Sequence, residues 1–316
     1  MKAITKQKYG GPEILRLKEV EKPALKENHL LIKVKANSAN PADWHILRGK
    51  PFLVRLTLGL FKPKTKVLGS DFAGIVEEVG PNASKYKAGD RVFGEMLKGG
   101  AFAEYISVPE KYCGLMPDET TYNEMACVPI AGLTALQALI THGNLKRGES
   151  VLINGSSGGV GHFSVQIAKA YGAHVTAVCS NRNIEFVKSI GADKAIAYDK
   201  ENIHYYNGEY DLVLDTHGNL NFYDYKRMGK KGVIVGFTTM GHMMSVMLRK
   251  TFSKFPLTQF TAEANNEDLN TLANLIKEGK VRTHVDRIYP YFKIPEAIEY
   301  IESMRTKGKV AMSWDL

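Results

Sequence analysis

Six short apolar segments alternate with helical segments between residues 150 and 262, and this alternation limits the fold more than any other feature of the chain. The segments are rich in β-branched residues and read, in order, SVLIN, HVTAVC, KAIAY, LVLD, GVIVGF and PLTQFTA. Strands that are apolar almost throughout are typical of a parallel sheet buried on both faces. Helical stretches such as GVGHFSVQIAKAYG and NIEFVKSIGA separate them. The alternation predicts an α/β fold with a doubly wound sheet of Rossmann type.

The chain on either side of these segments has a different character. Its first third consists of short strands broken by glycine and proline, such as HLLIKVKANSA and AFAEYISVP, which favours a compact β-barrel or sandwich. NEMACVPIAGLTALQALITHG then predicts a long buried helix ending at Gly143. After about residue 264 a helix, a strand, a helix and a strand follow, and we expect them to pack against the first third. The predicted domains are residues 1–122 together with 264–316, and an inserted Rossmann domain, residues 123–263.

Composition limits the class of protein further. The chain has 316 residues, enough for two domains, and a net charge of +9. A basic surface attracts nucleic acid, anionic lipid or an anionic ligand. The sequence shows neither arginine-aromatic interleaving nor zinc-finger spacing, so we expect no nucleic-acid partner. Three scattered cysteines, an N-terminus without an apolar signal core and the lack of a membrane-length apolar stretch predict a cytoplasmic protein.

The stretch VLINGSSGGVGHF, residues 151–163, fits two motifs that both lie between a strand and a helix. One is G-x-S-x-G, in which Ser157 would be a hydrolytic nucleophile. The other is the dinucleotide fingerprint G-x-G-x-x-G, with Ser156 in place of the first glycine and with Gly158 and Gly161 in the other two positions.

The dinucleotide interpretation explains more of the surrounding sequence. The stretch opens the first strand-turn-helix unit of the series, where a cofactor turn belongs, and the helix start offers free N–H groups to a pyrophosphate. A nucleophile needs an acid and then a histidine, and Asp215 followed by His217 or His242 is only formally available. The predicted cofactor contacts in this turn are Ser157, Gly158, Gly159, Val160 and Gly161.

The end of the second strand of the series indicates which cofactor binds. It reads Cys179-Ser180-Asn181-Arg182, without the carboxylate that usually bonds the ribose of NAD. Ser180 can donate a hydrogen bond and Arg182 can supply charge to a 2′-phosphate, which predicts NADP(H). The alternative is that Arg182 is a solvated residue at a helix start.

Several segments occur in the order of a known family, among them NPADWHILRG, LGSDFAGIVEEVG, GAFAEYISVP, GSSGGVGHFSVQIAKAYGA and GADKAIAY. On these residues the chain resembles the medium-chain dehydrogenase/reductase superfamily, in its zinc-free, zeta-crystallin-like quinone oxidoreductase branch. The resemblance covers nearly the whole chain. It implies a GroES-like catalytic domain built on a β-barrel, an inserted Rossmann domain, and commonly a homodimer.

Zinc-dependent members of that superfamily hold the metal through residues that this chain lacks. Ser70 stands where the resemblance places the histidine ligand, Asn40 falls near the first cysteine, and the last ligand falls near Ala131-Gly132. Dispersed cysteines and histidines show no zinc spacing either, so we predict no metal. Without a Lewis acid for a developing alkoxide, a conjugated acceptor is favoured, because its charge moves to a carbonyl oxygen that hydrogen-bond donors can stabilise.

The resemblance also implies the residues of the site. Asn40, Asp43 and Trp44 would border the nicotinamide and the substrate, and the alternatives are a turn cap for Asn40 and core packing for Trp44. Trp44 takes a place often held by tyrosine and lacks its hydroxyl, which puts a tyrosine-type proton donor in doubt. The remaining cofactor contacts that the resemblance implies are Thr134, Tyr198, Phe237 and Lys309, of which Tyr198 and Lys309 could instead be a strand-end aromatic residue and a surface charge.

One segment departs from the smallest family members. KPFLVRLTLGLFKPKTKVLGSD, residues 50–71, inserts an apolar and basic stretch in which Lys62, Lys64 and Lys66 could meet a membrane surface. We favour a flap over the substrate instead, and we expect loops around residues 44–66 and 238–252 to shape the pocket.

The sequence thus predicts a zinc-independent, NADPH-dependent oxidoreductase that reduces quinones or α,β-unsaturated carbonyls by hydride transfer. A reductase of enoyl thioesters or other double bonds on the same fold stays open. So does an NADPH-regulated RNA-binding protein without turnover, which a steep salt-dependent gel shift would reveal. The hydrolase is the weakest alternative, and the sequence does not identify the physiological substrate.

Overall fold

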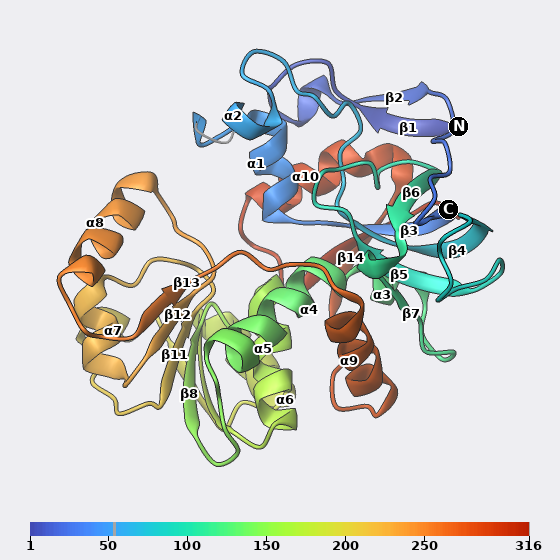
Figure 1. Cartoon of the computed structure of the whole chain (residues 1–316). Coiled ribbons are helices and arrows are strands. Elements are labelled where there is room, and N and C mark those ends of the chain that lie inside the picture. The colour runs from blue at the N-terminus through green and yellow to red at the C-terminus, as the bar shows by residue number, and fades with distance from the viewer. Residues whose placement is uncertain (53–54, 316) are drawn as a thin grey trace. The chain divides into compact units, whose positions relative to one another are not determined.

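The computed structural model describes residues 1–52 and 55–315 and divides the chain into two compact units (Figure 1). Unit 1 comprises Met1–Ile130, Ala264–Lys277 and Thr283–Leu316, and unit 2 comprises Ala131–Glu263 and Glu278–Arg282. The middle of the chain is therefore inserted into a unit built from both of its ends. The division follows Ile130, later than the change of character that the sequence shows near residue 123.

Unit 1 is built on a seven-stranded sheet in the order β14-β15-β3-β4-β5-β7, with β6 also paired to β3. β15 pairs antiparallel with β3, so the last strand of the chain packs against a strand of its first third. A separate two-stranded sheet joins β1 to β2. The strands are β1 (Lys2–Thr5), β2 (Arg16–Glu19), β3 (His29–Ala39), β4 (Asp71–Val79), β5 (Arg91–Glu95), β6 (Tyr105–Pro109), β7 (Cys113–Leu115), β14 (Val285–Pro290) and β15 (Lys309–Ser313).

Short helices cover the seven-stranded sheet and close its core. A cluster that includes Leu47, Phe102, Ile298 and Met312 joins side chains of helices and strands from both ends of the chain. This packing fixes the first helix directly after the end of β3, and it is there that Asn40 lies. The helices of unit 1 are α1 (Pro41–Arg48), α2 (Arg55–Leu58), α3 (Tyr122–Ala126), α9 (Asn266–Lys277) and α10 (Ile294–Glu302).

Unit 2 contains the predicted doubly wound sheet. Its six strands are all parallel and lie in the order β10-β9-β8-β11-β12-β13, the order of a Rossmann fold. The order reverses beside β8, at the point where such sheets bind ligands outside the carboxyl ends of their strands. The strands are β8 (Ser150–Asn154), β9 (His174–Cys179), β10 (Lys194–Ala197), β11 (Leu212–Asp215), β12 (Gly232–Ile234) and β13 (Leu257–Gln259).

Helices connect these strands and bury an apolar core of their own. Leu152, Val213, Tyr225 and Ile234 are among its fully buried members. No helix in the described ranges is both long enough and apolar enough to cross a membrane. The helices are α5 (Gly159–Ala170), α6 (Ile184–Ser189), α7 (Phe222–Met228) and α8 (Met240–Thr251), and α4 (Pro129–Leu136) leads into the unit.

The prediction of one long helix that ends at Gly143 is wrong. The segment divides into α3, α4 and a π-helical stretch, Gln137–His142. Pro129 explains the first break, because proline has no N–H to donate and its ring clashes with the carbonyl four residues earlier. The backbone N–H of Cys127 instead bonds to Glu124 at the end of α3.

The two segments expected to be loops contain helices. α8 lies within residues 238–252, and its start is capped by the Thr239 hydroxyl, which accepts the N–H of His242 at 3.1 Å. That cap was readable from the sequence, since threonine is a common residue at the start of a helix. α1 and α2 likewise occupy part of residues 44–66, whose residues 53–54 lie outside those that the structure describes.

Candidate functional site

The turn between β8 and α5 has the backbone form of a dinucleotide cradle. Gly155 adopts a φ of +81°, and Gly158 caps the start of α5. A Cβ on Gly161 would lie 2.2 Å from the carbonyl oxygen of Gly155, so the helix can approach the strand this closely only with glycine there. A Cβ on Gly158 would lie 3.5 Å from the same oxygen, an ordinary contact. The protein itself thus leaves room beside Gly158, at a helix end where N–H groups can meet a phosphate.

Hydrogen bonds fix this turn to the end of β9. The Ser156 hydroxyl donates to the carbonyl oxygen of Val178 at 2.9 Å, and the backbone N–H groups of Gly155 and Ser156 reach the same oxygen. The Ser157 hydroxyl accepts the side-chain N–H of Asn183 at 2.9 Å. Ser157 is therefore paired with an amide that follows the second strand, where a nucleophile would need a histidine.

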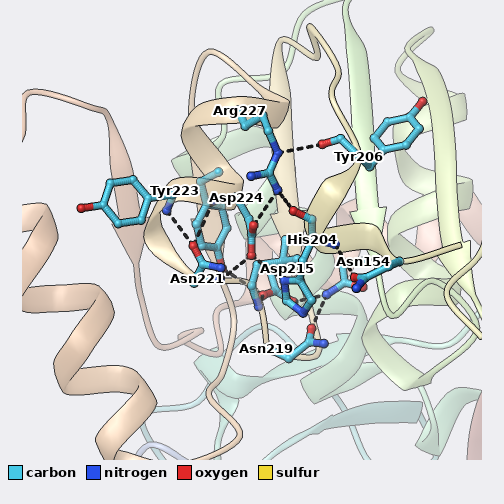
Figure 2. Close-up of polar contacts among 12 residues, drawn as sticks. Asn154, His204, Tyr206, Asp215, Asn219, Asn221, Tyr223, Asp224 and Arg227 are labelled. Carbon is cyan, nitrogen blue, oxygen red and sulfur yellow. Dashed lines mark hydrogen bonds and ion pairs between the residues drawn. The ribbon is translucent and has the colours of Figure 1, made fainter.

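Asp215 is the acid that a catalytic triad would require, but its carboxylate is hydrogen-bonded to groups other than a histidine side chain (Figure 2). Its buried carboxylate accepts the side-chain N–H of Asn154 at 2.8 Å, the Tyr225 hydroxyl at 2.9 Å and the backbone N–H of Gly218 at 2.7 Å. Asn154 also bonds to Asn219 at 2.7 Å. Asp215 thus ties the loop after β11 to the end of β8, which positions the cofactor turn and does not assemble a triad.

A second buried carboxylate, Asp224, organises the start of α7 in the same view (Figure 2). It accepts the backbone N–H of Asn221 at 2.9 Å and pairs with the Arg227 guanidinium and with Nδ1 of His204, both at 2.7 Å. The guanidinium also donates to the carbonyl oxygens of His204 and Tyr206. These bonds join α7 to the segment that precedes β11.

The residues predicted to read the ribose gather at the ends of two neighbouring strands. β9 and β10 pair Cys179 with Ala197, so Ser180 and Arg182 follow one strand and Tyr198 follows the other. Arg182 is exposed and Tyr198 is 54% exposed, so both can meet a ligand. Sequence reasoning missed Asp199, whose carboxylate accepts the N–H of Asn181 at 2.8 Å and brings a negative charge to this edge.

The other predicted cofactor contacts of unit 2 are less open. Thr134 is buried in α4, and Val160 and Gly159 form the first turn of α5. Phe237 packs against the core of the unit and meets the ring of His242 edge to face. Its segment is held close to the loop after β11, because the N–H of Thr238 donates to the carbonyl of Gly218 at 3.2 Å.

In unit 1 the predicted residue Asn40 lies in a buried polar cluster. Its side-chain N–H donates to Asp71 at 2.8 Å, and its backbone N–H donates to Asp43 at 2.8 Å. Its side-chain oxygen accepts a hydrogen bond from Nζ of Lys309, which also lies 3.5 Å from a carboxylate oxygen of Asp71. Asp71 also accepts the N–H of Ile130 at 3.1 Å. The side chains that make up the cluster are each at most 4% exposed: Asn40, Asp43, Asp71 and Lys309.

Burial changes the proton affinities of this cluster. Removal from water raises the pKa of Asp43 to about 7, an effect that the N–H of Asn40 opposes and the charge of Asp71 reinforces. Burial also raises the pKa of Asp71, with the Lys309 ammonium opposing it. Glu95 pairs with Asp71 across β4 and β5, and burial next to two carboxylates raises its pKa to about 8. The Lys309 ammonium lowers the pKa of all three carboxyl groups, and the Lys6 ammonium also interacts with Asp43. Burial outweighs these charges at Glu95, whose pKa of about 8 keeps it largely protonated at neutral pH.

Two further predicted residues of unit 1 lie in packed surroundings, and their predicted roles stay predictions. The ammonium of Lys309, a predicted cofactor contact, is engaged within unit 1 by Asn40 and Asp71. Trp44 lies in α1, is half-buried, stacks on the ring of His45 with centroids 3.6 Å apart, and packs against the core. Sequence reasoning missed Asp71 as a partner of Asn40, although a carboxylate at the start of an apolar strand was a signal for it.

Comparison with known proteins assigns the chain to a family. Residues 26–118 match the alcohol dehydrogenase GroES-like domain, and residues 190–312 match the zinc-binding dehydrogenase domain. A chloroplast envelope quinone oxidoreductase homolog of Arabidopsis thaliana is 36% identical over 94% of this chain and 93% of its own. A 2-methylene-furan-3-one reductase of Solanum lycopersicum is 34% identical, and the match covers 99% of this chain and 79% of the reductase. A trans-enoyl reductase of Aspergillus terreus is 32% identical, and the match covers 91% of this chain and 87% of the reductase.

Solved structures agree with these relatives. The quinone oxidoreductase of Coxiella burnetii superposes with a TM-score of 0.88 at 31% identity, covering 99% of both chains. The Escherichia coli quinone oxidoreductase, solved in complex with NADPH, shares the fold with a TM-score of 0.84 at 24% identity over 99% of this chain and 100% of its own.

The fold and the cofactor turn define a nicotinamide-dependent oxidoreductase of the α/β class. The chain belongs to the medium-chain dehydrogenase/reductase superfamily, in its quinone oxidoreductase branch. The predicted family, fold class and enzymatic nature are thus confirmed.

The donors of unit 1 do not fit the zinc that the name of the matched domain suggests. Ser70, at the expected histidine position, donates its hydroxyl to Asp43 at 3.4 Å. Within residues 1–52 and 55–315, no group of three or more His, Cys, Asp or Glu side chains could hold a metal ion. Ammonium groups lie among these acids instead: Lys309 is 3.5 Å from Asp71, and Lys6 interacts with Asp43.

Proposed function

We propose that the chain catalyses the NADPH-dependent reduction of quinones or α,β-unsaturated carbonyl compounds without zinc. The observation that carries the proposal is the cradle at the start of α5, where Gly161 packs against Gly155 while the space beside Gly158 stays open. It occurs in a chain whose relatives include a quinone oxidoreductase homolog and a furanone reductase.

NADP(H) would be held by unit 2. The N–H groups of the first turn of α5 would meet the pyrophosphate, and Ser180, Arg182 and Tyr198 would meet the 2′-phosphate end. Thr134 and the backbone at Phe237 would serve the nicotinamide end. Bound NADPH would supply the hydride. Arg182 carries the proposal of NADP(H) over NAD(H), and Asp199 opposes it, because a carboxylate repels a 2′-phosphate.

Asn40 and Asp43 of unit 1 would serve the carbonyl oxygen of the substrate. When the conjugated carbon of the substrate takes up a hydride, negative charge develops on that oxygen, and a fixed N–H donor stabilises it. The side chain of Asn40 gives one of its two N–H groups to Asp71, which leaves the other to donate. Asp43, with a pKa of about 7, holds a proton in part of the molecules at neutral pH. After hydride transfer, solvent supplies the proton that the oxygen or carbon of the substrate needs to complete the reduction.

Turnover with matched acceptors tests this proposal. NADPH and NADH oxidation at 340 nm would be measured with a panel of small quinones and a panel of small enones. We expect turnover with NADPH and a preference for one panel, which names the reaction. Tight NADPH binding without turnover on either panel would overturn the proposal and favour the regulated RNA-binding alternative.

A trans-enoyl reductase among the relatives keeps a second candidate, the reduction of enoyl thioesters. An enoyl thioester is also a conjugated carbonyl, so the same donors would serve it. Adding a crotonyl thioester to the panels separates the two, because a thioester reductase would turn it over faster than the matching enone.

The remaining proposals concern partners. We propose a homodimer located in the cytoplasm, with light scattering as the test of the dimer. The segment around α2 exposes Phe52 and Phe61, at 62% and 86%, beside Lys62 and Lys64. We propose that this segment covers bound substrate, and a membrane surface is its alternative occupant.

A further inference from the structure

We propose that Lys309 is a positioning residue that acts through Asn40, by fixing the direction in which the Asn40 side chain presents its free N–H. The inference rests on the proposed function, and it gives Lys309 a role other than contact with the cofactor.

The hydrogen bonds around Asn40 permit one orientation of its side-chain amide. The amide oxygen faces a donor, the Lys309 ammonium, and the amide nitrogen faces an acceptor, the Asp71 carboxylate, at 2.8 Å. A half-turn of the amide would set N–H against ammonium and oxygen against carboxylate. Both contacts would then repel, in a cluster so buried that water cannot relieve them.

Hydrogen bonds to Asp43 fix the main chain of Asn40, from which this side chain extends. The N–H of Asn40 donates to Asp43 at 2.8 Å, and the N–H of Asp43 donates back to the Asn40 carbonyl at 3.0 Å. Asn40 thus has its main chain fixed by Asp43 and its amide fixed by Lys309 and Asp71. The second N–H of the amide is the donor that these partners leave unused.

Lys309 has little freedom to do anything else. It opens β15, which pairs with β3 next to Asn40, and the residue is 4% exposed. Its ammonium lies 3.5 Å from Asp71, itself fully buried, so the pair supplies the charge balance that both groups need. An ammonium held in this way is a fixed cation beside Asn40.

The test replaces both charged partners together, so that no charge is left buried alone. In Lys309→Met/Asp71→Asn the amide of Asn40 loses its donor partner, while in Lys309→Gln/Asp71→Asn a side chain of similar length still donates to it. A matched control, Lys35→Met/Asp315→Asn, removes a partly exposed ion pair of the same unit, 2.8 Å long.

We expect kcat of the methionine form to fall by about tenfold or more, because misplacing one donor costs a large part of its effect on the transition state. The glutamine form should retain kcat within about threefold and the control within about twofold, with the KM for NADPH nearly constant in all three. With NADPH deuterated at C4, the isotope effect on kcat should rise in the methionine form only.

A cycle with Asn40→Ala identifies the route. If Lys309 acts through Asn40, the methionine pair should cost nothing further in that background. A full additional loss of kcat there, or equal kcat in the methionine and glutamine forms, would overturn the inference. Should the methionine form fail to fold, a tenfold loss of kcat in the folded glutamine form would overturn it instead. Absence of turnover by the unmodified enzyme would count against the proposed function and not against this role.

Discussion

Gly161 and Gly158 should respond to the same substitution in opposite ways, because the protein excludes a methyl group at one and tolerates it at the other. In Gly161→Ala the new Cβ would meet the Gly155 oxygen at 2.2 Å and the Cα of Ser156 at 2.6 Å. Ordinary contacts begin near 3.4 Å, so helix and turn must separate by roughly 1 Å. Overpacking of that kind costs about 1–3 kcal/mol of unfolding free energy.

Gly158→Ala should leave stability nearly unchanged, within about 0.5 kcal/mol, since its Cβ meets the Gly155 oxygen at an ordinary 3.5 Å and its φ of −81° suits alanine. Its methyl group would instead fill the space proposed for the pyrophosphate, and the Kd for NADPH should rise by about tenfold or more. Urea unfolding and fluorescence titration with NADPH measure the two effects. Unchanged NADPH affinity in Gly158→Ala would refute the placement of the cofactor.

Further predictions concern specificity, pH and the exposed segment. Arg182→Ala should reduce the preference for NADPH over NADH by about tenfold, the loss of one charge-assisted contact, and Asp199→Asn should increase it; kcat/KM for both cofactors measures this, and equal shifts for both would contradict it. Burial raises the pKa of Glu95 from 4.5 to about 8, so the folded state binds the extra proton and its stability is lost as pH rises through that interval. The unfolding free energy of Glu95→Gln, taken relative to that of the unmodified protein, should therefore rise by on the order of 3 kcal/mol between pH 5 and pH 8. Urea unfolding at both pH values measures this difference. If the unfolding free energies of the two proteins changed in parallel with pH, the assignment would be disproved. Vesicles rich in phosphatidylglycerol should not sediment the protein; sedimentation that Phe52→Ser/Phe61→Ser abolishes would assign the segment to a membrane surface.

Much of unit 2 could be predicted because its signals are local. The strands SVLIN and LVLD have the same bounds in the structure as the predicted segments. The break at Pro129 was also a local signal, yet the apolar residues on both sides of it outweighed it in the prediction of one helix. The helix α8 was missed because its methionines favour an adaptable loop as well as a helix, and only the cap at Thr239 distinguishes them.

The candidate site was predictable where one turn forms it and obscure where distant strands meet. The cradle of Gly158 and Gly161 is a single stretch, so spacing alone indicates it. The cluster of Asn40, Asp71 and Lys309 joins β3, β4 and β15, which only the pairing of the sheet brings together. A sequence shows no long-range register, so the engagement of Lys309 within unit 1 required the structure.

Deuterium tracing tests the central claim of metal-free conjugate reduction most directly. The enzyme, treated with a chelator, would be given NADPH carrying deuterium in both positions of C4 and a small enone, and the product would be examined by NMR. We predict one deuterium at the β-carbon of a saturated ketone, at the rate of the untreated enzyme. Deuterium at the carbonyl carbon of an allylic alcohol, lost with the chelator and restored by zinc, would contradict the account.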